Sequence, residues 1–190
     1  MTFKTHLMEA SRLLNASATD AVEAQMARAI DAIAVSLAAD RALLVCGNGG
    51  SASDALHIAG ELVAQFMKKR RALKAICLGA NMAALTAWAN DYSYESAYAR
   101  QVEAFGEKGG VLLALSTSGN SKNVVAALER ARALGMTTIG MTGQGGGKMA
   151  GLCDILLEAP SRATPDIQQV HICMYHYLCA EVEARFETTA

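Results

Sequence analysis

From about residue 40 onward, short apolar runs alternate along the chain with segments of helical apolar spacing. The runs are Ala42–Cys46, Ala75–Leu78, Val111–Leu115, Thr137–Met141 and Ile155–Leu157. Short, continuous apolar runs are typical of strands buried on both faces, and the helical segments between them suit the crossovers of a parallel sheet. The alternation therefore predicts an α/β fold, with a parallel five-stranded sheet flanked by helices.

Two helices are predicted ahead of the sheet, at about Lys4–Asn15 and Asp20–Ala38. The second has apolar residues at helical spacing, namely Val22, Met26, Ala29, Ile30, Ile33 and Leu37. Such faces need a cover, which we expect to be another subunit as well as the protein's own core. We predict one domain over 1–190, in which 1–39 form helices for oligomer packing and 40–190 form the α/β core. The core is expected to end in a helix from about Pro165 to Arg185.

Composition narrows the class of partner. Seventeen basic against eighteen acidic residues give a net charge of −1, and no basic stripe interleaves with aromatic residues, so no nucleic acid is expected as a partner. No apolar run approaches the ~20 residues needed to cross a bilayer, so no membrane partner is expected. The first residues lack the apolar segment of a secretory signal, which predicts a cytoplasmic protein. The five cysteines, odd in number and without a C-x-x-C pair, are expected to be reduced core residues.

Two turns follow predicted strands at the edge where parallel sheets bind ligands. Gly47–Ser51 is rich in glycine, which lets backbone approach a ligand. The other turn adds hydroxyl groups to the unpaired N–H groups of a helix start, an arrangement that suits a phosphate. Its hydroxyl residues are Ser116, Thr117, Ser118 and Ser121. Without a Walker lysine or a G-x-G-x-x-G spacing, a sugar monophosphate fits better than a nucleotide.

Each of these turns also has a plain structural interpretation. Serine and threonine are common helix caps, and glycine is common in any tight turn. Ser51 or Ser53 is the predicted cap of the helix after the first turn. A third cluster, Gly143–Gly147, is predicted to be an ordinary flexible connection.

Residues able to do chemistry lie on two predicted helices. His57 and Glu61 are four residues apart and therefore project from one face, the spacing of metal ligands. The same spacing often only stabilises a helix surface, but the apolar neighbours make a simply solvated face a poor explanation. Gln168 and His176 are two turns apart and about 80° around the axis, so both can border one cavity. His171 points elsewhere and is predicted either to be structural or to support a residue of the site. A core histidine is the alternative for His176.

Taken in order, these residues form a familiar combination. The motifs are Asn48-Gly49-Gly50-Ser51, His57-Ile58-Ala59-Gly60-Glu61, Asn90-Asp91-Tyr92, Ser116-Thr117-Ser118-Gly119-Asn120-Ser121, Ile167-Gln168 and His176. Over nearly all 190 residues, the chain resembles the bacterial phosphoheptose isomerases, which have a flavodoxin-like sugar isomerase (SIS) domain. It departs from them at Gly110, where relatives usually carry Asp, and at Pro165 before Asp166.

The resemblance implies conversion of sedoheptulose 7-phosphate to D-glycero-D-manno-heptose 7-phosphate, the first step toward heptose precursors for lipopolysaccharide core or surface glycans. It also implies a homotetramer and one Zn²⁺ per subunit. The implied metal ligands are His57, Glu61, Gln168 and His176. The implied substrate contacts are Asn48, Gly49, Gly50, Ser51, Glu61, Asn90, Asp91, Ser116, Thr117, Ser118, Ser121 and Gln168.

Aldose–ketose isomerisation moves a proton between C1 and C2 through an ene-diol, which requires a base at carbon and an acid at oxygen. Glu61 is the expected base and His176 the expected acid. A carboxylate bound to metal is a weaker base, so either Glu61 acts as zinc ligand and as base in different states, or the zinc is mainly organisational.

Two other functions fit the same fold. One is a non-catalytic adaptor that resembles the replication-initiator-associating protein of bacteria; the other is a sugar-phosphate sensor or an isomerase of another ketose phosphate. Fold alone does not separate these. The presence of Glu61, Gln168 and His176 together favours the enzyme, because an adaptor has no use for a carboxylate at residue 61.

Overall fold

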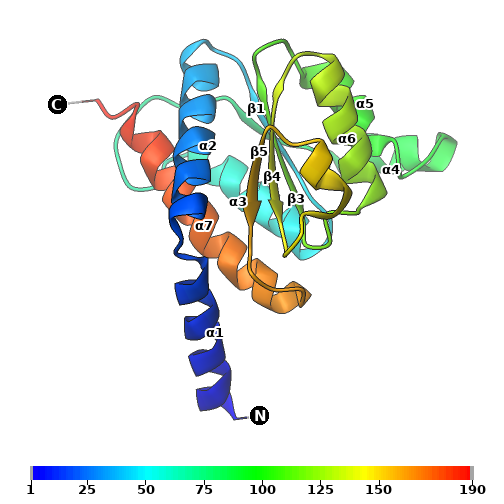
Figure 1. The fold of residues 1–190 in the computed structure, drawn as a ribbon. Coiled ribbons are helices and arrows are strands. Elements are labelled where there is room, and N and C mark those ends of the chain that lie inside the picture. Colours follow the sequence, from blue (N-terminus) through cyan, green and yellow to red (C-terminus); the bar gives the residue numbers. More distant parts are fainter. Residues whose placement is uncertain (1, 189–190) are drawn as a thin grey trace.

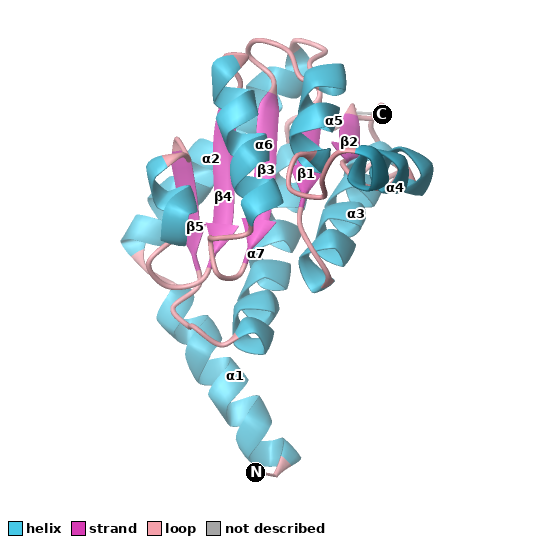
Figure 2. Cartoon of the chain, turned by 90° about the vertical axis from the view of Figure 1, so that its right-hand side faces the viewer, coloured by secondary structure: helices cyan, strands magenta, loops and turns pink. Residues whose placement is uncertain are grey.

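The computed structural model describes residues 2–188, and a five-stranded parallel sheet lies at its centre (Figure 2). The strands are β1 (Leu43–Cys46), β2 (Ala75–Cys77), β3 (Val111–Ser116), β4 (Thr137–Thr142) and β5 (Ile155–Glu158). They are ordered β2-β1-β3-β4-β5 across the sheet. All five apolar runs form strands, which confirms the predicted fold class.

Helices cover both faces of this sheet (Figure 1). The helices are α1 (Phe3–Ser17), α2 (Asp20–Ala38), α3 (Gly50–Val63), α4 (Met82–Asp91), α5 (Ala97–Phe105), α6 (Lys122–Ala133) and α7 (Thr164–Ala184), with a 3-10 turn, η1 (Gly147–Gly151). Helices α2, α3 and α7 pack on one face, whereas α5 and α6 pack on the other. The predicted N-terminal helices and the C-terminal helix are confirmed.

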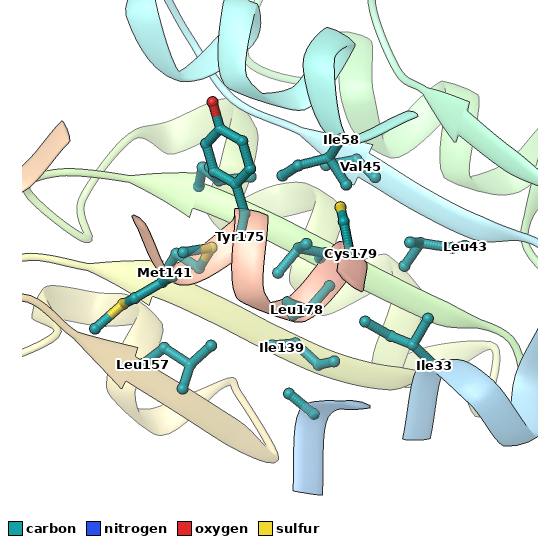
Figure 3. Packing of buried hydrophobic residues seen from close by; sticks show 14 of the residues in the cluster. Ile33, Leu43, Val45, Ile58, Ile139, Met141, Leu157, Tyr175, Leu178 and Cys179 are labelled. Atoms are coloured by element: carbon teal, nitrogen blue, oxygen red, sulfur yellow. The ribbon is translucent and has the colours of Figure 1, made fainter. Parts of the chain in front are cut away.

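The core has two layers because side chains alternate along each strand. Leu43 and Val45 of β1 pack toward α7, whereas Leu44 and Cys46 face α5 and α6. Figure 3 shows the first layer, in which Tyr175, Leu178 and Cys179 of α7 lie against Leu43, Val45, Ile58, Ile139 and Leu157. Strands covered on both faces explain the continuous apolar runs of the sequence.

Helix α1 extends away from the rest of the fold (Figures 1 and 2). Leu13 is its one buried residue, while Phe3, Leu7 and Met8 are exposed. A cavity of about 360 Å³ opens where α1 and α2 meet α7, and its lining includes Leu14, Met26 and Tyr177. Apolar surface of this kind is typical of a protein–protein contact.

Within residues 2–188, no helix has both the length and the apolar character needed to span a bilayer.

Two local predictions are wrong. Helix α3 begins at Gly50 with Gly49 as its N-cap, so neither Ser51 nor Ser53 caps it. Gly49 has φ of 57°, and this left-handed conformation turns the chain into the helix before either serine. Among the cysteines, Cys173 is exposed on α7, because α7 presents that side to the outside of the chain.

The carboxyl end of α3 is fixed by a buried ion pair. Glu183 on α7 accepts hydrogen bonds from the N–H groups of Phe66, Met67 and Lys68 at 2.6–2.9 Å. The guanidinium of Arg70 lies 3.2 Å from Glu183, both side chains being fully buried, and donates to the carbonyl of Glu61 at 2.7 Å. Burial by itself acts to raise the pKa of Glu183, but the backbone donors and Arg70 bring it below its ordinary value.

His171 is structural, one of the two roles predicted for it. It is fully buried, and its Nε2 lies 3.1 Å from the carbonyl of Thr142. Nε2 therefore carries the proton, because a carbonyl oxygen only accepts. Burial lowers the pKa of His171 from 6.5 to about 4, although the bond to Thr142 acts in the opposite direction.

Burial of His171 predicts a pH dependence of stability. The unfolded chain binds a proton at His171 near pH 6.5 and the folded chain only near pH 4, so the free energy of unfolding falls as pH drops through this window. Chemical denaturation at pH 7 and pH 5 measures the change. The His171→Gln variant lacks this titration and should lose less stability between the two values. Equal losses would contradict the prediction.

Candidate functional site

The candidate site lies at the point where strand order reverses. From β1 the chain runs to β2 on one side of it and then to β3 on the other, so the loops after β1 and β3 leave neighbouring strands. Parallel sheets bind ligands in the crevice outside this point. Both predicted ligand turns, 47–51 and 116–121, therefore lie at the same edge of the sheet.

Hydroxyl groups converge in the loop after β3. Ser116 Oγ lies 2.9 Å from Ser121 Oγ and 3.5 Å from Ser118 Oγ. Ser121 occupies the N-cap position of α6, yet its side chain makes no capping hydrogen bond. The plain interpretation of this serine as a cap is therefore not supported, and the first-turn N–H groups of α6 lack a side-chain acceptor from Ser121. Hydroxyls and amide groups together suit a phosphate.

The glycine loop after β4 supports the hydroxyl loop. The N–H of Gly143 donates to the Thr117 carbonyl at 3.0 Å, and the carbonyl of Gly146 lies against Gly119, where a Cβ atom would collide with it. A polar cavity of about 350 Å³ between these loops is also lined by Gln144 and Arg162. The predicted plain connection over Gly143–Gly147 is thus a packed support with polar groups around it.

Gln168 lies at the turn after β1. Its side-chain amide occupies the space beside the Cα of Gly50, so a Cβ atom at residue 50 would displace this amide. Asn48, also in this turn, is half-buried and hydrogen-bonded to Asn123 and Tyr94. The helix that carries Gln168 therefore reaches the glycine turn, and three predicted substrate residues, Asn48, Gly50 and Gln168, share one place.

The predicted chemical residues meet further along α3 and α7. His57 Nε2 lies 2.8 Å from Glu61 Oε1, and the rings of His57 and His176 have centroids 5.2 Å apart. The Glu61 side chain is 22% exposed and that of His57 is 41% exposed, so both are open to a ligand. The structure brings together a carboxylate and two imidazoles, as predicted from spacing.

Two residues that the sequence analysis missed complete a chain of hydrogen bonds to Glu61. Tyr175 hydroxyl lies 3.0 Å from His57 Nδ1 and 3.4 Å from Asp54 Oδ1. Asp54 Oδ2 is buried without a hydrogen-bond partner in the described residues. Burial raises the pKa of Asp54, while the Tyr175 bond and His57 act to lower it. Asp54 precedes His57 by three residues, which was a usable signal; nothing in the sequence pointed to Tyr175.

Removing the Tyr175 hydroxyl should disturb His57. In Tyr175→Phe the ring still fills the core, but His57 loses the partner that orients its ring and selects its tautomer. Loss of such a supporting bond typically costs about 10- to 100-fold in activity or metal affinity. Steady-state kinetics and a thermal melt measure the two effects. Unchanged kcat/KM in a variant with wild-type Tm would contradict this role.

Some predicted residues are not brought together. Asn90 and Asp91 end α4, are exposed, and hydrogen-bond to each other at 2.9 Å, but within residues 2–188 neither hydrogen-bonds to another predicted substrate residue. Gln168 and His176 lie about 12 Å apart along α7, given a rise of 1.5 Å per residue. Gln168 therefore meets Gly50 while His176 meets His57.

The donor atoms at His57, Glu61 and His176 fit zinc by type, because zinc binds imidazole nitrogen and carboxylate oxygen. In this arrangement His57 Nε2 bonds to Glu61, and the described residues hold no group of three His, Cys, Asp or Glu side chains directed at one metal position. Binding a metal here therefore requires the His57–Glu61 hydrogen bond to be replaced by bonds to the ion.

Comparison with known proteins defines the class first. The model of the SIS domain family matches residues 6–143, which include most of α1, all of α2 and the two ligand turns. The same fold, at 16% identity and a TM-score of 0.66, occurs in the Vibrio vulnificus NanR protein complexed with ManNAc-6P, covering 95% of this chain and 60% of that one.

Closer relatives define the family. The chain is 50% identical over 156 residues to the phosphoheptose isomerase of Crocosphaera subtropica, covering 82% of this chain and 80% of the relative. It is 54% identical over 144 residues to that of Helicobacter pylori strain P12, covering 76% and 75%. The phosphoheptose isomerase structure from Francisella tularensis has a TM-score of 0.91 at 32% identity, covering 97% of this chain and 100% of that one. This chain belongs to the phosphoheptose isomerase family of SIS-domain proteins.

Proposed function

We propose that this chain isomerises sedoheptulose 7-phosphate to D-glycero-D-manno-heptose 7-phosphate. One observation carries the proposal: the Glu61 carboxylate is partly exposed and bonded at 2.8 Å to His57, whose ring lies beside that of His176, in a fold whose relatives are phosphoheptose isomerases. A non-catalytic adaptor gains nothing from a carboxylate and two imidazoles in this position. The site therefore supports an enzyme over an adaptor.

The reaction requires one base and one acid, and the residues supply both. Glu61 removes a proton from C1 of the ketose, which leaves an ene-diol, and returns a proton to C2. His176 moves the proton between the oxygens on C1 and C2, so that the carbonyl passes from C2 to C1. Because His57 holds Glu61 and is itself held by Tyr175, the carboxylate has a fixed direction before substrate arrives.

The other residues bind the remainder of the substrate. Ser116, Thr117, Ser118 and Ser121 hold the phosphate with their hydroxyls and with the N–H groups at the start of α6. Asn48, Gly49, Gly50, Ser51, Asn90, Asp91 and Gln168 complete the predicted sugar contacts. Because the phosphate is held at one end of the substrate, C1 and C2 at the other end are oriented toward the reacting residues.

Zinc is the proposed cofactor. His57, Glu61 and His176 would hold it, with Gln168 as the remaining ligand predicted by resemblance. When bound, zinc supplies Lewis acidity that polarises a sugar oxygen or fixes the geometry. Glu61 then has two proposed roles, as a zinc ligand and as the base. Measuring turnover after the metal has been removed by a chelator distinguishes these roles.

We also propose a cytoplasmic homotetramer. Exposed Phe3, Leu7 and Met8 on α1 and the apolar cavity beside Leu14 support packing of copies through the N-terminal helices. The product is proposed to supply heptose for lipopolysaccharide core or surface glycans. Light scattering measures the assembly mass, and a monomeric mass would contradict the tetramer.

The deciding experiment uses sedoheptulose 7-phosphate in deuterium oxide. The C1 and C2 protons are followed by NMR with native protein, after chelation, and after addition of zinc. Appearance of the aldoheptose phosphate establishes the isomerase, and loss followed by rescue with zinc establishes a functional metal. Binding without turnover in all three conditions would replace the enzyme with a sugar-phosphate sensor.

A further inference from the structure

We propose that Tyr94 and Asn123 position Asn48 so that its amide meets the sugar phosphate only as a hydrogen-bond donor. The three side chains come from distant segments: Asn48 follows β1, Tyr94 lies between α4 and α5, and Asn123 is in the first turn of α6. This inference deepens the proposed function and rests on it for the identity of the ligand.

The orientation of Asn123 is fixed by a backbone group. Its side chain is buried, and the N–H of Val124 donates to its Oδ1 at 3.0 Å. A backbone N–H only donates, so the atom that it meets is the oxygen of the amide. The nitrogen of the Asn123 amide therefore occupies the other position, from which it donates to Asn48.

The orientation of Asn48 follows from that of Asn123. Asn123 Nδ2 donates to Asn48 Oδ1 at 2.9 Å, and Asn48 Nδ2 donates back to Asn123 Oδ1 at 2.8 Å. Tyr94 hydroxyl donates to the same Asn48 Oδ1 at 2.8 Å. A carbonyl oxygen has two lone pairs and an amide nitrogen has two N–H groups. Both lone pairs of Asn48 are thus used, and one N–H is left.

The remaining N–H of Asn48 selects its partner on the ligand. Asn48 can donate to a carbonyl, hydroxyl or phosphate oxygen of the substrate but cannot accept from a sugar hydroxyl. Without Tyr94, one lone pair of Oδ1 becomes free and the amide loses a restraint. The ring of Tyr94, whose centroid lies 6.5 Å from that of Tyr98, is kept in Tyr94→Phe, so the segment retains its packing.

Tyr94→Phe removes only the hydroxyl, and Tyr92→Phe is its matched control. Tyr92 lies two residues away, is exposed, stacks on Trp88 at 4.1 Å, and its hydroxyl makes no hydrogen bond in residues 2–188. We expect Tyr94→Phe to raise KM for sedoheptulose 7-phosphate about 3- to 10-fold, the range of one neutral hydrogen bond, with a smaller change in kcat. Affinity for inorganic phosphate, held by the serine loop, should stay at the wild-type value.

A double-mutant cycle tests whether Tyr94 acts through Asn48. In the Asn48→Ala background, adding Tyr94→Phe should change KM less than 2-fold. Additive effects would overturn the proposal, as would an unchanged KM in Tyr94→Phe or an equal loss of phosphate affinity. If the wild type binds the sugar phosphate without turning it over, the isomerase assignment fails, and calorimetric Kd values in the same cycle decide the positioning proposal by the same criteria.

Discussion

Glu61→Gln should lower turnover of sedoheptulose 7-phosphate by at least about two orders of magnitude, the usual scale for loss of a general base. The amide has nearly the same shape as the carboxylate and retains an oxygen that can accept from His57, so the local fold should persist. What the amide lacks is the ability to take the C1 proton. Turnover is measured by the appearance of the aldoheptose phosphate, and deuterium exchange at C1 reports the proton transfer directly.

The control for this variant is Glu129→Gln, which makes the same chemical change on the exposed side of α6. Inorganic phosphate should bind Glu61→Gln as tightly as it binds the wild type, because the serine loop is unchanged. Wild-type turnover in Glu61→Gln would remove Glu61 from the base role. Lost phosphate affinity would show that the variant had disturbed the site as a whole.

Glu183→Ala should destabilise the protein by roughly 3–5 kcal/mol, the cost of removing one partner of a buried ion pair. The Arg70 guanidinium would remain buried without its carboxylate, and the N–H groups of Phe66, Met67 and Lys68 would lose their acceptor. Denaturant titration measures the free energy of unfolding. Because Arg70 also binds the carbonyl of Glu61, kcat should fall under conditions in which the variant remains folded.

Glu187→Ala provides the comparison, since Glu187 pairs with Lys68 on the surface in the same region. Exposed ion pairs contribute little, so this variant should stay close to the wild type in stability. The lowered pKa of Glu183 also sets the direction of a pH dependence. The stabilisation by Glu183 is present above the pKa of the unfolded carboxyl and is lost as pH falls through the pKa of the folded state. A similar decrease in the free energy of unfolding in Glu183→Ala and Glu187→Ala would show that burial does not make the Arg70–Glu183 pair more important than the surface pair.

The fold was predictable because strands that are buried on both faces have continuous apolar sequences. Val111–Leu115 and Ile155–Leu157 are apolar at every position, and helical spacing between such runs specifies crossovers. The residues at which helices start were harder to predict. The first turn of α3 depends on a left-handed Gly49, and a glycine-rich sequence does not show which glycine adopts that conformation.

The site was predictable where one element carries two of its residues. His57 and Glu61 sit four apart on α3, so their contact follows from helix geometry. The Asn48–Asn123 pair and the buried Arg70–Glu183 pair join segments 75 and more residues apart, and no local pattern records such contacts. Gln168 is a further example: the turn that it contacts was predicted from the sequence, but its packing against Gly50 was not.

The position of α7 in the chain has a consequence for how the protein is made. Both ligand turns and the whole sheet precede α7, yet Gln168, Tyr175 and His176 all belong to it. Segments leave the ribosome in sequence order, but a domain generally folds as a unit. Because α7 supplies core residues against one face of the sheet, a nascent chain without it also lacks His176, the proposed acid, and Tyr175, the support for His57. Catalytic competence is acquired last, only when the final helix has docked.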